Sequence, residues 1–192
     1  DARHNLSWNN LGSALEKIGD KVGALTAYES ALRINPDHAE AQNNVGAIYS
    51  EQGRLDEARA AFQRAIDTQH DFVEAHYNLS SLKKYSRDDP HLSMLEQVFS
   101  QRQHLSAGAR IRYAFALGKA LDDIGEIDRA FAAYDEGNRL QHAALPMDEH
   151  RADALVQAII TTFDEKFFAE RRPWQSVAVD PARVPVFIVG MP

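Results

Sequence analysis

The stretch WNNLGSAL, residues 8–15, recurs in altered form as QNNVGAIY, residues 42–49, and this repetition decides the fold. The two stretches lie 34 residues apart, and small and aromatic residues keep the same spacing throughout residues 5–38 and 39–72. The recurring positions are Trp8, Leu11, Gly12, Leu15, Gly19, Ala24, Tyr28, Ala31 and Pro36 in the first copy, and Gln42, Val45, Gly46, Tyr49, Gly53, Ala58, Phe62, Ala65 and His70 in the second. Such a period predicts a chain built from stacked supersecondary units.

Two further copies follow. A third begins with VEAHYNLSSLKK at Val73 and departs from the pattern at YSRDDP, after which we expect a helix to restart near His91. A fourth occupies residues 111–140, where the recurring positions are Leu117, Gly118, Leu121, Gly125, Ala130, Tyr134 and Gly137. Because Ile111 follows Val73 by 38 residues rather than 34, the third copy carries four extra residues.

The pattern resembles the tetratricopeptide repeat, whose signature W-x2-L-G-x2-Y…A-x3-F…P has this period. The resemblance covers roughly residues 3–142, with Gln42 in place of the Trp and His70 in place of the Pro. It implies an all-α, right-handed solenoid of about four helical hairpins. Gly12 and Ala24 are small enough to let the two helices of a hairpin approach closely, and Gly19 and Gly53 are placed to end first helices in a left-handed conformation.

The helix starts and the end of the solenoid give further expectations. Asp37 with Glu40, and Asp71 with Glu74, have the spacing of capping boxes at the start of the next helix. After the repeats, apolar residues recur at helical spacing within residues 144–171. We interpret this region as a capping helix that closes the open end of the solenoid.

Composition excludes several classes of function. The 192 residues include no cysteine, so disulfides and thiolate zinc sites are excluded. The net charge of −7 argues against a nucleic-acid partner, because such proteins usually present a basic face. No stretch approaches the ~20 apolar residues of a membrane span, and no leader is visible, so we expect no membrane contact and a cytoplasmic location.

The last nine residues, VPVFIVGMP at 184–192, form an apolar run bounded by Pro and Gly, which is typical of a buried β-strand. A linker at 172–183 precedes it. The order of repeats, a helix and then this run resembles the tetratricopeptide-repeat sulfotransferases, and FALGKALDDIGEIDRAFAAYDEGN, residues 115–138, resembles the last repeat of that family. The resemblance implies that Gly190, Met191 and Pro192 approach an Arg-Ser-Gly-Thr loop that binds 3′-phosphoadenosine 5′-phosphosulfate. Since that loop is missing, the strand is expected to be the first element of a truncated catalytic domain. An alternative is that the tail packs locally on the last helices. As an orphaned strand, 184–192 is also expected to favour self-association.

No catalytic or metal-binding pattern is found in the sequence. The eight histidines show no metal-ligand spacing, and His70 and His76 are best interpreted as surface or inter-repeat residues. The adjacent acids Asp122 and Asp123 point apart on a helix, so they do not form a catalytic pair. We therefore expect the chain itself to bind and not to catalyse.

A candidate binding site comes from three asparagines. Asn10, Asn44 and Asn78 occupy one equivalent position in three successive repeats. The family resemblance implies that this position faces the concave groove, and it is similar to the asparagine ladder of O-linked N-acetylglucosamine transferase. An amide offers both donor and acceptor groups to the backbone of an extended peptide. The expected neighbours on this face are Asn9, Asn43, Ser13, Ser81 and Lys84. The alternative is that these amides only join neighbouring helices.

The sequence thus predicts a repeat solenoid over residues 1–143, with a degenerate third repeat at 73–110, then the capping region, the linker and the single strand. The expected function is polypeptide binding by the repeat arm of a sulfotransferase. A non-catalytic repeat adaptor and the repeat arm of a glycosyltransferase are the alternatives.

Overall fold

The computed structural model describes residues 2–144, 149–163 and 166–167, and it describes side chains for 4–144, 153–163 and 166–167. The chain divides into two compact units, Asp1–Leu145 and Pro146–Pro192, which are considered separately.

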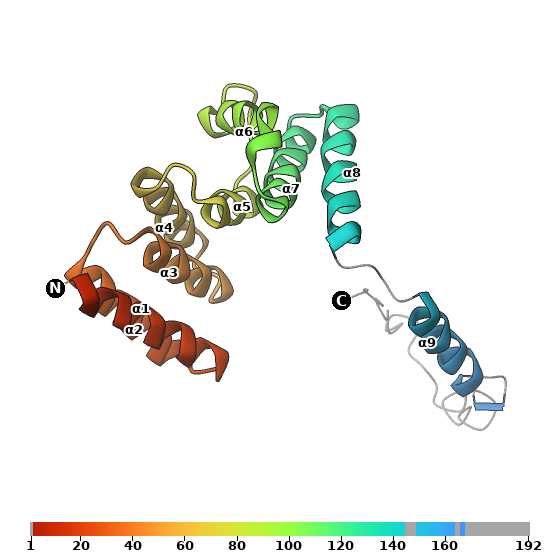
Figure 1. The fold of residues 1–192 in the computed structure, drawn as a ribbon, viewed down its shortest axis with the longest axis horizontal. Helices are drawn as coiled ribbons and strands as arrows, with labels where there is room; N and C mark the ends of the chain where they lie inside the picture. Colours follow the sequence, from red (N-terminus) through yellow and green to blue (C-terminus); the bar gives the residue numbers. More distant parts are fainter. Residues whose placement is uncertain (1, 145–148, 164–165, 168–192) are drawn as a thin grey trace, which may run out of the picture. The chain divides into compact units, whose positions relative to one another are not determined.

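The first unit is a succession of helices that stack in the order of the chain (Figure 1). Helices α1 and α2, α3 and α4, and α7 and α8 pack together as hairpins, and α2 packs on α3 and α4 on α5. The helices are α1 (Ala2–Lys17), α2 (Lys21–Ile34), α3 (Ala39–Glu51), α4 (Leu55–Thr68), α5 (Val73–Leu82), α6 (Pro90–Ser100), the 3-10 helix η1 (Arg102–His104), α7 (Ala107–Asp123) and α8 (Ile127–Ala144). This arrangement confirms the all-helical solenoid over these residues.

Each regular hairpin is closed by one aromatic ring lying on one glycine. A Cβ atom on Gly12 would lie 2.5 Å from the ring of Tyr28, and one on Gly46 would lie 2.7 Å from the ring of Phe62. Both distances are shorter than carbon contacts allow, so any larger residue would push the helices apart. The fourth copy repeats the contact with Gly118 and Tyr134.

Replacement of Gly46 by Ala tests this contact. We expect Gly46→Ala to lower the free energy of unfolding by about 1–3 kcal/mol, because the added methyl group overpacks against Phe62 and Ala61. Gly108→Ala is the matched control, since a Cβ there meets only the end of Arg112 at 3.7 Å and the higher helix propensity of Ala favours the variant. Urea denaturation of both variants measures the difference. Equal stabilities would contradict the proposed contact.

The turns between paired helices use glycine as predicted. Gly19 and Gly53 have φ angles of 86° and 75°, and Gly125 in the fourth copy has 79°. Each lies in the left-handed region that other residues adopt only with strain. The first helix therefore ends at the same place in three hairpins.

The predicted capping boxes are wrong. Helix α3 has His38 as its N-cap residue and α5 has Phe72, and neither side chain caps its helix. Asp37 precedes the N-cap residue His38 by one position. The backbone N–H of Asp37 donates to Asn35 Oδ1 at 3.2 Å within the turn.

The third repeat departs from the regular hairpin. Helix α5 packs on α4 and α7, and α6 packs on α7. Helix α6 begins at Pro90, where the Asp89 carboxylate accepts from the backbone N–H of His91, so the predicted restart near His91 is confirmed. The intervening loop is anchored to α7, because Asp123 Oδ2 accepts from the backbone N–H of Tyr85 at 2.9 Å.

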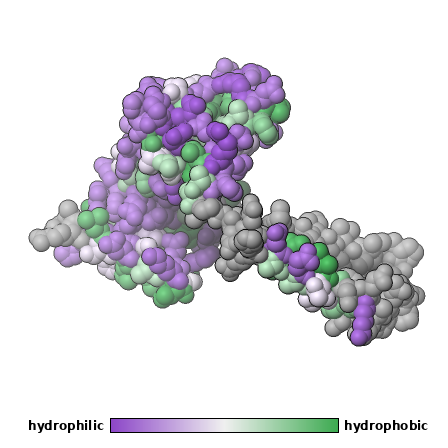
Figure 2. All heavy atoms as spheres, turned by 45° about the vertical axis from the view of Figure 1, so that its right-hand side comes forward, coloured by the Kyte–Doolittle hydropathy of each residue, from purple (hydrophilic) through white to green (hydrophobic). Residues whose placement is uncertain are grey.

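Apolar side chains gather between successive repeats. On the face of the first unit seen in Figure 2, most of the surface is hydrophilic. The largest cluster lies around Leu92, Leu95, Tyr113, Leu117 and Leu121, where α6 meets α7. Two smaller clusters join α2 to α3 and α4 to α5. These inter-repeat cores fix the spacing of the first helices on which the candidate site lies.

The second unit contains α9 (Glu149–Thr162). Apolar side chains on it, Leu155, Val156, Ile159 and Ile160, are exposed within the described residues. Helix α9 lies in the region predicted to cap the solenoid, and the capping role stays a prediction. The predicted linker at 172–183 and strand at 184–192, with Gly190, Met191 and Pro192, lie outside the described residues.

Candidate functional site

The asparagines of the first three repeats form hydrogen-bonded pairs between neighbouring first helices. Asn44 on α3 donates from Nδ2 to Asn9 Oδ1 on α1 at 3.3 Å. Asn78 on α5 donates in the same way to Asn43 Oδ1 on α3 at 2.9 Å. Asn43 also lies 3.5 Å from Asn44 Oδ1, at the limit of a hydrogen bond. Hydrogen bonds between asparagine side chains therefore join the first helices of three successive repeats.

The pairs contain two kinds of position. Asn9 and Asn43 are only 1% and 7% exposed, whereas Asn10 is exposed and Asn44 and Asn78 are half-buried. We call Asn10, Asn44 and Asn78 the amide row. Each side-chain amide has two N–H donors and an oxygen with two lone pairs. The pairing with the preceding repeat uses one donor of Asn44 and of Asn78, so the row keeps donors and acceptors for a ligand.

The prediction that Asn9 and Asn43 lie on the groove surface is wrong. Adjacent residues on an α-helix point about 100° apart. In the pairs Asn9-Asn10 and Asn43-Asn44, the first asparagine is therefore buried in the contact between repeats. There it accepts a hydrogen bond and orients the amide row. The predicted alternative, amides that join neighbouring helices, also holds for Asn44 and Asn78, since each donates to an asparagine of the preceding first helix. The second N–H and the oxygen lone pairs of each amide are the groups left for a ligand.

The other predicted neighbours are dispersed. Ser13 is half-buried on α1, and Ser81 is exposed on α5, where its hydroxyl donates to the carbonyl of Asn78 at 2.7 Å. Lys84 follows the end of α5 and borders a pocket of about 440 Å³ that Arg59 and Gln63 of α4 also line. Ser81 thus lies beside the amide row, and Lys84 lies among residues of the second helix of the preceding repeat.

A buried polar chain, which the sequence reasoning missed, links α5, α6 and the loop between them. His76 Nδ1 lies 2.9 Å from His91 Nε2, and His91 Nδ1 lies 2.7 Å from the hydroxyl of Tyr85. At the other end, His76 Nε2 lies 2.8 Å from the carbonyl oxygen of His70. Both histidines and Tyr85 are buried, and the ring of Tyr113 packs 5.7 Å from that of His76.

The carbonyl oxygen of His70 can only accept, so His76 donates to it from Nε2. If both imidazoles are neutral, His76 accepts at Nδ1 from His91 Nε2–H, and His91 accepts at Nδ1 from Tyr85 O–H. This assignment requires both imidazoles to be neutral. Burial, helped by the neighbouring His76 and Lys83, lowers the pKa of His91 to about 4, and burial also lowers the pKa of His76. These hydrogen bonds join α5, α6 and their connecting loop within the third repeat, and they tie α5 to the end of the second repeat at His70.

Within the described ranges 2–144, 149–163 and 166–167, no three His, Asp or Glu side chains are grouped to hold a metal ion. Among the described helices, none combines the length and apolar character that a membrane crossing requires.

Comparison with known sequences identifies the repeats. The model of the family described as "Tetratricopeptide repeat" matches residues 9–74. Similar proteins include the BBSome complex member bbs-4 of Caenorhabditis elegans, 43% identical over 47 residues, and Tetratricopeptide repeat protein 8 of the same organism, 40% identical over 50 residues. Protein FlbA of Caulobacter vibrioides is 42% identical over 48 residues. These matches cover 24–26% of this chain and only 8–10% of each relative.

Solved structures share the fold. The crystal structure of MamA superposes with a TM-score of 0.55 at 20% identity, over 77% of this chain and 84% of MamA. The O-GlcNAc transferase of Thermobaculum terrenum, as its K341M mutant, superposes with a TM-score of 0.50 at 20% identity, over 72% of this chain and 26% of that enzyme. Residues 9–74 therefore match the tetratricopeptide repeat, and the first unit shares its helical fold with these solved structures.

Proposed function

We propose that the first unit binds an extended polypeptide along the amide row. The observation that carries this proposal is the pairing of Asn44 with Asn9 and of Asn78 with Asn43, which orients the amides of Asn44 and Asn78 and leaves part of their hydrogen-bonding capacity unused. Tetratricopeptide repeats are protein-interaction modules, which supports a polypeptide as the ligand.

The spacing of the row suits a polypeptide backbone. Packed helices lie about 8–10 Å apart, and an extended chain advances about 3.3 Å per residue. One amide of the row therefore meets the ligand about every third residue. Because peptide N–H and C=O groups are the same in every sequence, the row holds the backbone and leaves side-chain selection to other positions.

A triple variant tests the proposal. Peptides from a random 12-residue phage-display library are selected on the 192-residue chain, labelled, and titrated with it in fluorescence anisotropy. We expect Asn10→Ala with Asn44→Ala and Asn78→Ala to weaken binding by about 100-fold, since each lost hydrogen bond contributes about 0.5–1.5 kcal/mol.

Gln97→Ala on α6 is the control, because it removes an exposed amide outside the row. It is expected to leave the affinity unchanged. A triple variant that binds the selected peptides as tightly as the original chain would refute the role of the row.

The narrower proposal, that these repeats are the arm of a sulfotransferase using 3′-phosphoadenosine 5′-phosphosulfate, rests on the resemblance of residues 184–192 and of the repeats that precede them. None of the relatives named above carries a sulfotransferase name. The test is the coding sequence after the codon for Pro192. Arg-Ser-Gly-Thr supports the proposal, and a stop codon or an unrelated sequence contradicts it.

A further inference from the structure

The contact between neighbouring first helices changes character along the solenoid. At the first two junctions the buried asparagine of one repeat pairs with the amide row of the next. In the third repeat Tyr77 stands at the position of Asn9 and Asn43, and in the fourth repeat Ala116 stands at the position of the amide row. Neither residue can form the amide pair, so the third junction needs a different filling.

A pocket of about 500 Å³ opens at this third junction. Tyr77 of α5 lines it on one side, and Ile111 and Phe115 of α7 line it on the other. Tyr77 is 40% exposed, although its counterparts Asn9 and Asn43 are buried. The volume falls within the roughly 300–1,000 Å³ typical of ligand pockets.

The lining combines aromatic rings with polar groups. The ring of Phe115 packs against the ring of Tyr134, with ring centroids 6.3 Å apart. Asn138 and Gln141 of α8 line the pocket, as does Arg112, whose guanidinium lies 3.6 Å from the Glu74 carboxylate. Aromatic rings favour offset or edge-to-face contacts with other rings, and a guanidinium favours an aromatic face. A flat side chain with a polar edge satisfies both.

We propose that this pocket, which we call the aromatic subsite, receives a Tyr or Trp side chain of the polypeptide bound along the amide row. The inference rests on the proposed function. The amide row binds only the backbone of the ligand, and the aromatic subsite adds selection for one of the ligand's side chains. Asn78, the last member of the row, directly follows Tyr77 on α5. A chain held by Asn78 therefore reaches the subsite within a few residues, which sets the register of the ligand.

The test uses a variant that fills the subsite. Gly108 lines the pocket at the start of α7, and a Cβ there meets only Arg112 Nη1 at 3.7 Å, so Gly108→Trp places an indole in the subsite without overpacking the core. Gln97→Ala, an exposed position on α6 outside the pocket lining, is the control. The 12-residue phage-display library is selected in parallel on the unmodified chain, on Gly108→Trp, on Gln97→Ala and on the triple asparagine variant.

We expect the unmodified chain and Gln97→Ala to select peptides with Tyr or Trp at one fixed position, and Gly108→Trp to select peptides without that enrichment. Replacing the enriched aromatic residue by Ala is expected to weaken binding to the unmodified chain at least tenfold, and to Gly108→Trp less than twofold. Tyr77→Ser, which removes one wall, is expected to reproduce the loss.

The outcomes separate the two proposals. Peptides that bind through the amide row but show no aromatic enrichment, or the same enrichment on Gly108→Trp, overturn the aromatic subsite and leave the proposed function standing. Selected peptides that are insensitive to the triple asparagine variant overturn the proposed function. Failure of the unmodified chain to select any peptide overturns both.

Discussion

Phe62→Ala is expected to lower the free energy of unfolding of the first unit by about 3–5 kcal/mol, the range for removal of a fully buried aromatic side chain. The ring is 2% exposed, rests on Gly46, and belongs to the cluster that joins α4 to α5. Because Gly46 has no side chain that could fill the space, the cavity remains. Chemical denaturation followed by far-ultraviolet circular dichroism measures the loss.

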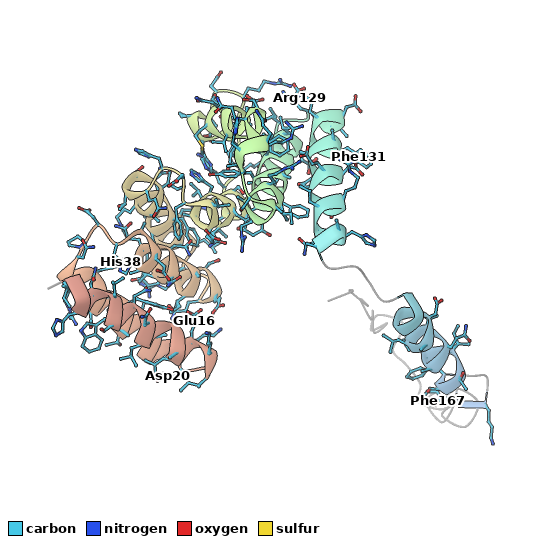
Figure 3. The ribbon with its side chains drawn as sticks, in the orientation of Figure 1. Glu16, Asp20, His38, Arg129, Phe131 and Phe167 are labelled. Carbon is cyan, nitrogen blue, oxygen red and sulfur yellow. The ribbon has the colours of Figure 1, made fainter. Side chains whose placement is uncertain are left out.

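Phe131→Ala provides the matched control. Phe131 has the same side chain but lies 71% exposed on α8, where it projects away from the helix pair (Figure 3). We expect its replacement to change the free energy of unfolding by less than about 0.5 kcal/mol. Similar effects of the two replacements would contradict the assignment of Phe62 to the core between repeats.

Acidification is expected to destabilise the first unit through His91. The pKa of His91 is about 4 in the folded protein, against about 6.5 in the unfolded chain. Below pH 6.5 the unfolded chain therefore binds a proton at His91 that the folded protein does not bind. The contribution of neutral His91 to the free energy of unfolding is fully present above about pH 6.5 and is lost as the pH falls toward 4. Between pH 7 and pH 5 the loss is about 2 kcal/mol, at 1.36 kcal/mol per pH unit. His76, whose pKa is also lowered by burial, adds a loss of the same sign.

His91→Gln separates this effect from the titration of other groups. Nearby charges that face the histidine chain, such as Lys83 and Asp89, are retained in the variant. The glutamine amide can accept from Tyr85 O–H and donate to His76 Nδ1, but it does not titrate. We expect the dependence of the free energy of unfolding on pH to become shallower by about 1 kcal/mol per pH unit between pH 6 and pH 5. His104→Gln, which removes an exposed histidine, should leave it unchanged. An unchanged slope in His91→Gln would disprove the buried neutral assignment.

The regular hairpins were predictable because their determinants are local. Gly12 and Gly46 lie in the same helical hairpin as the rings that cover them, and Gly19 and Gly53 act within a single turn. A fixed period of 34 residues therefore carries the full information about these contacts. The capping boxes could not be predicted from their spacing, because the same Asp and Glu spacing fits a helix that begins at the Asp and a helix that begins one residue later.

The third repeat could be predicted only as an irregularity. Its geometry depends on partners 15–39 residues away, such as the pairing of His76 with His91, of Tyr85 with Asp123, and of Arg87 with Glu126. None of these contacts recurs with the repeat period. Sequence spacing therefore located the break at YSRDDP but gave no account of why α5 packs on α7.

For the candidate site, the repeat period predicted that Asn10, Asn44 and Asn78 are equivalent. The structure then showed that the preceding residues Asn9 and Asn43 are buried and do not belong to the amide row. Asn9 and Asn10 are indistinguishable by residue type, and only the approach of α3 shows which one is buried. The aromatic subsite was invisible because Tyr77 and Phe115 come from different repeats and Asn138 comes from the following helix. The replacement of Asn by Tyr77 and by Ala116 was the available signal.

The most direct test of the central claim follows the side-chain amides of the row by nuclear magnetic resonance. The ¹⁵N–¹H signals of Asn10, Asn44 and Asn78 are assigned from single Asn→Ala variants of the 192-residue chain, and a peptide selected on the unmodified chain is then titrated to saturation. If the row holds the peptide backbone, all three pairs of signals shift with one common affinity, while the side-chain amide of Gln97 stays in place. Saturable binding that leaves the three asparagine amides unchanged would contradict the account.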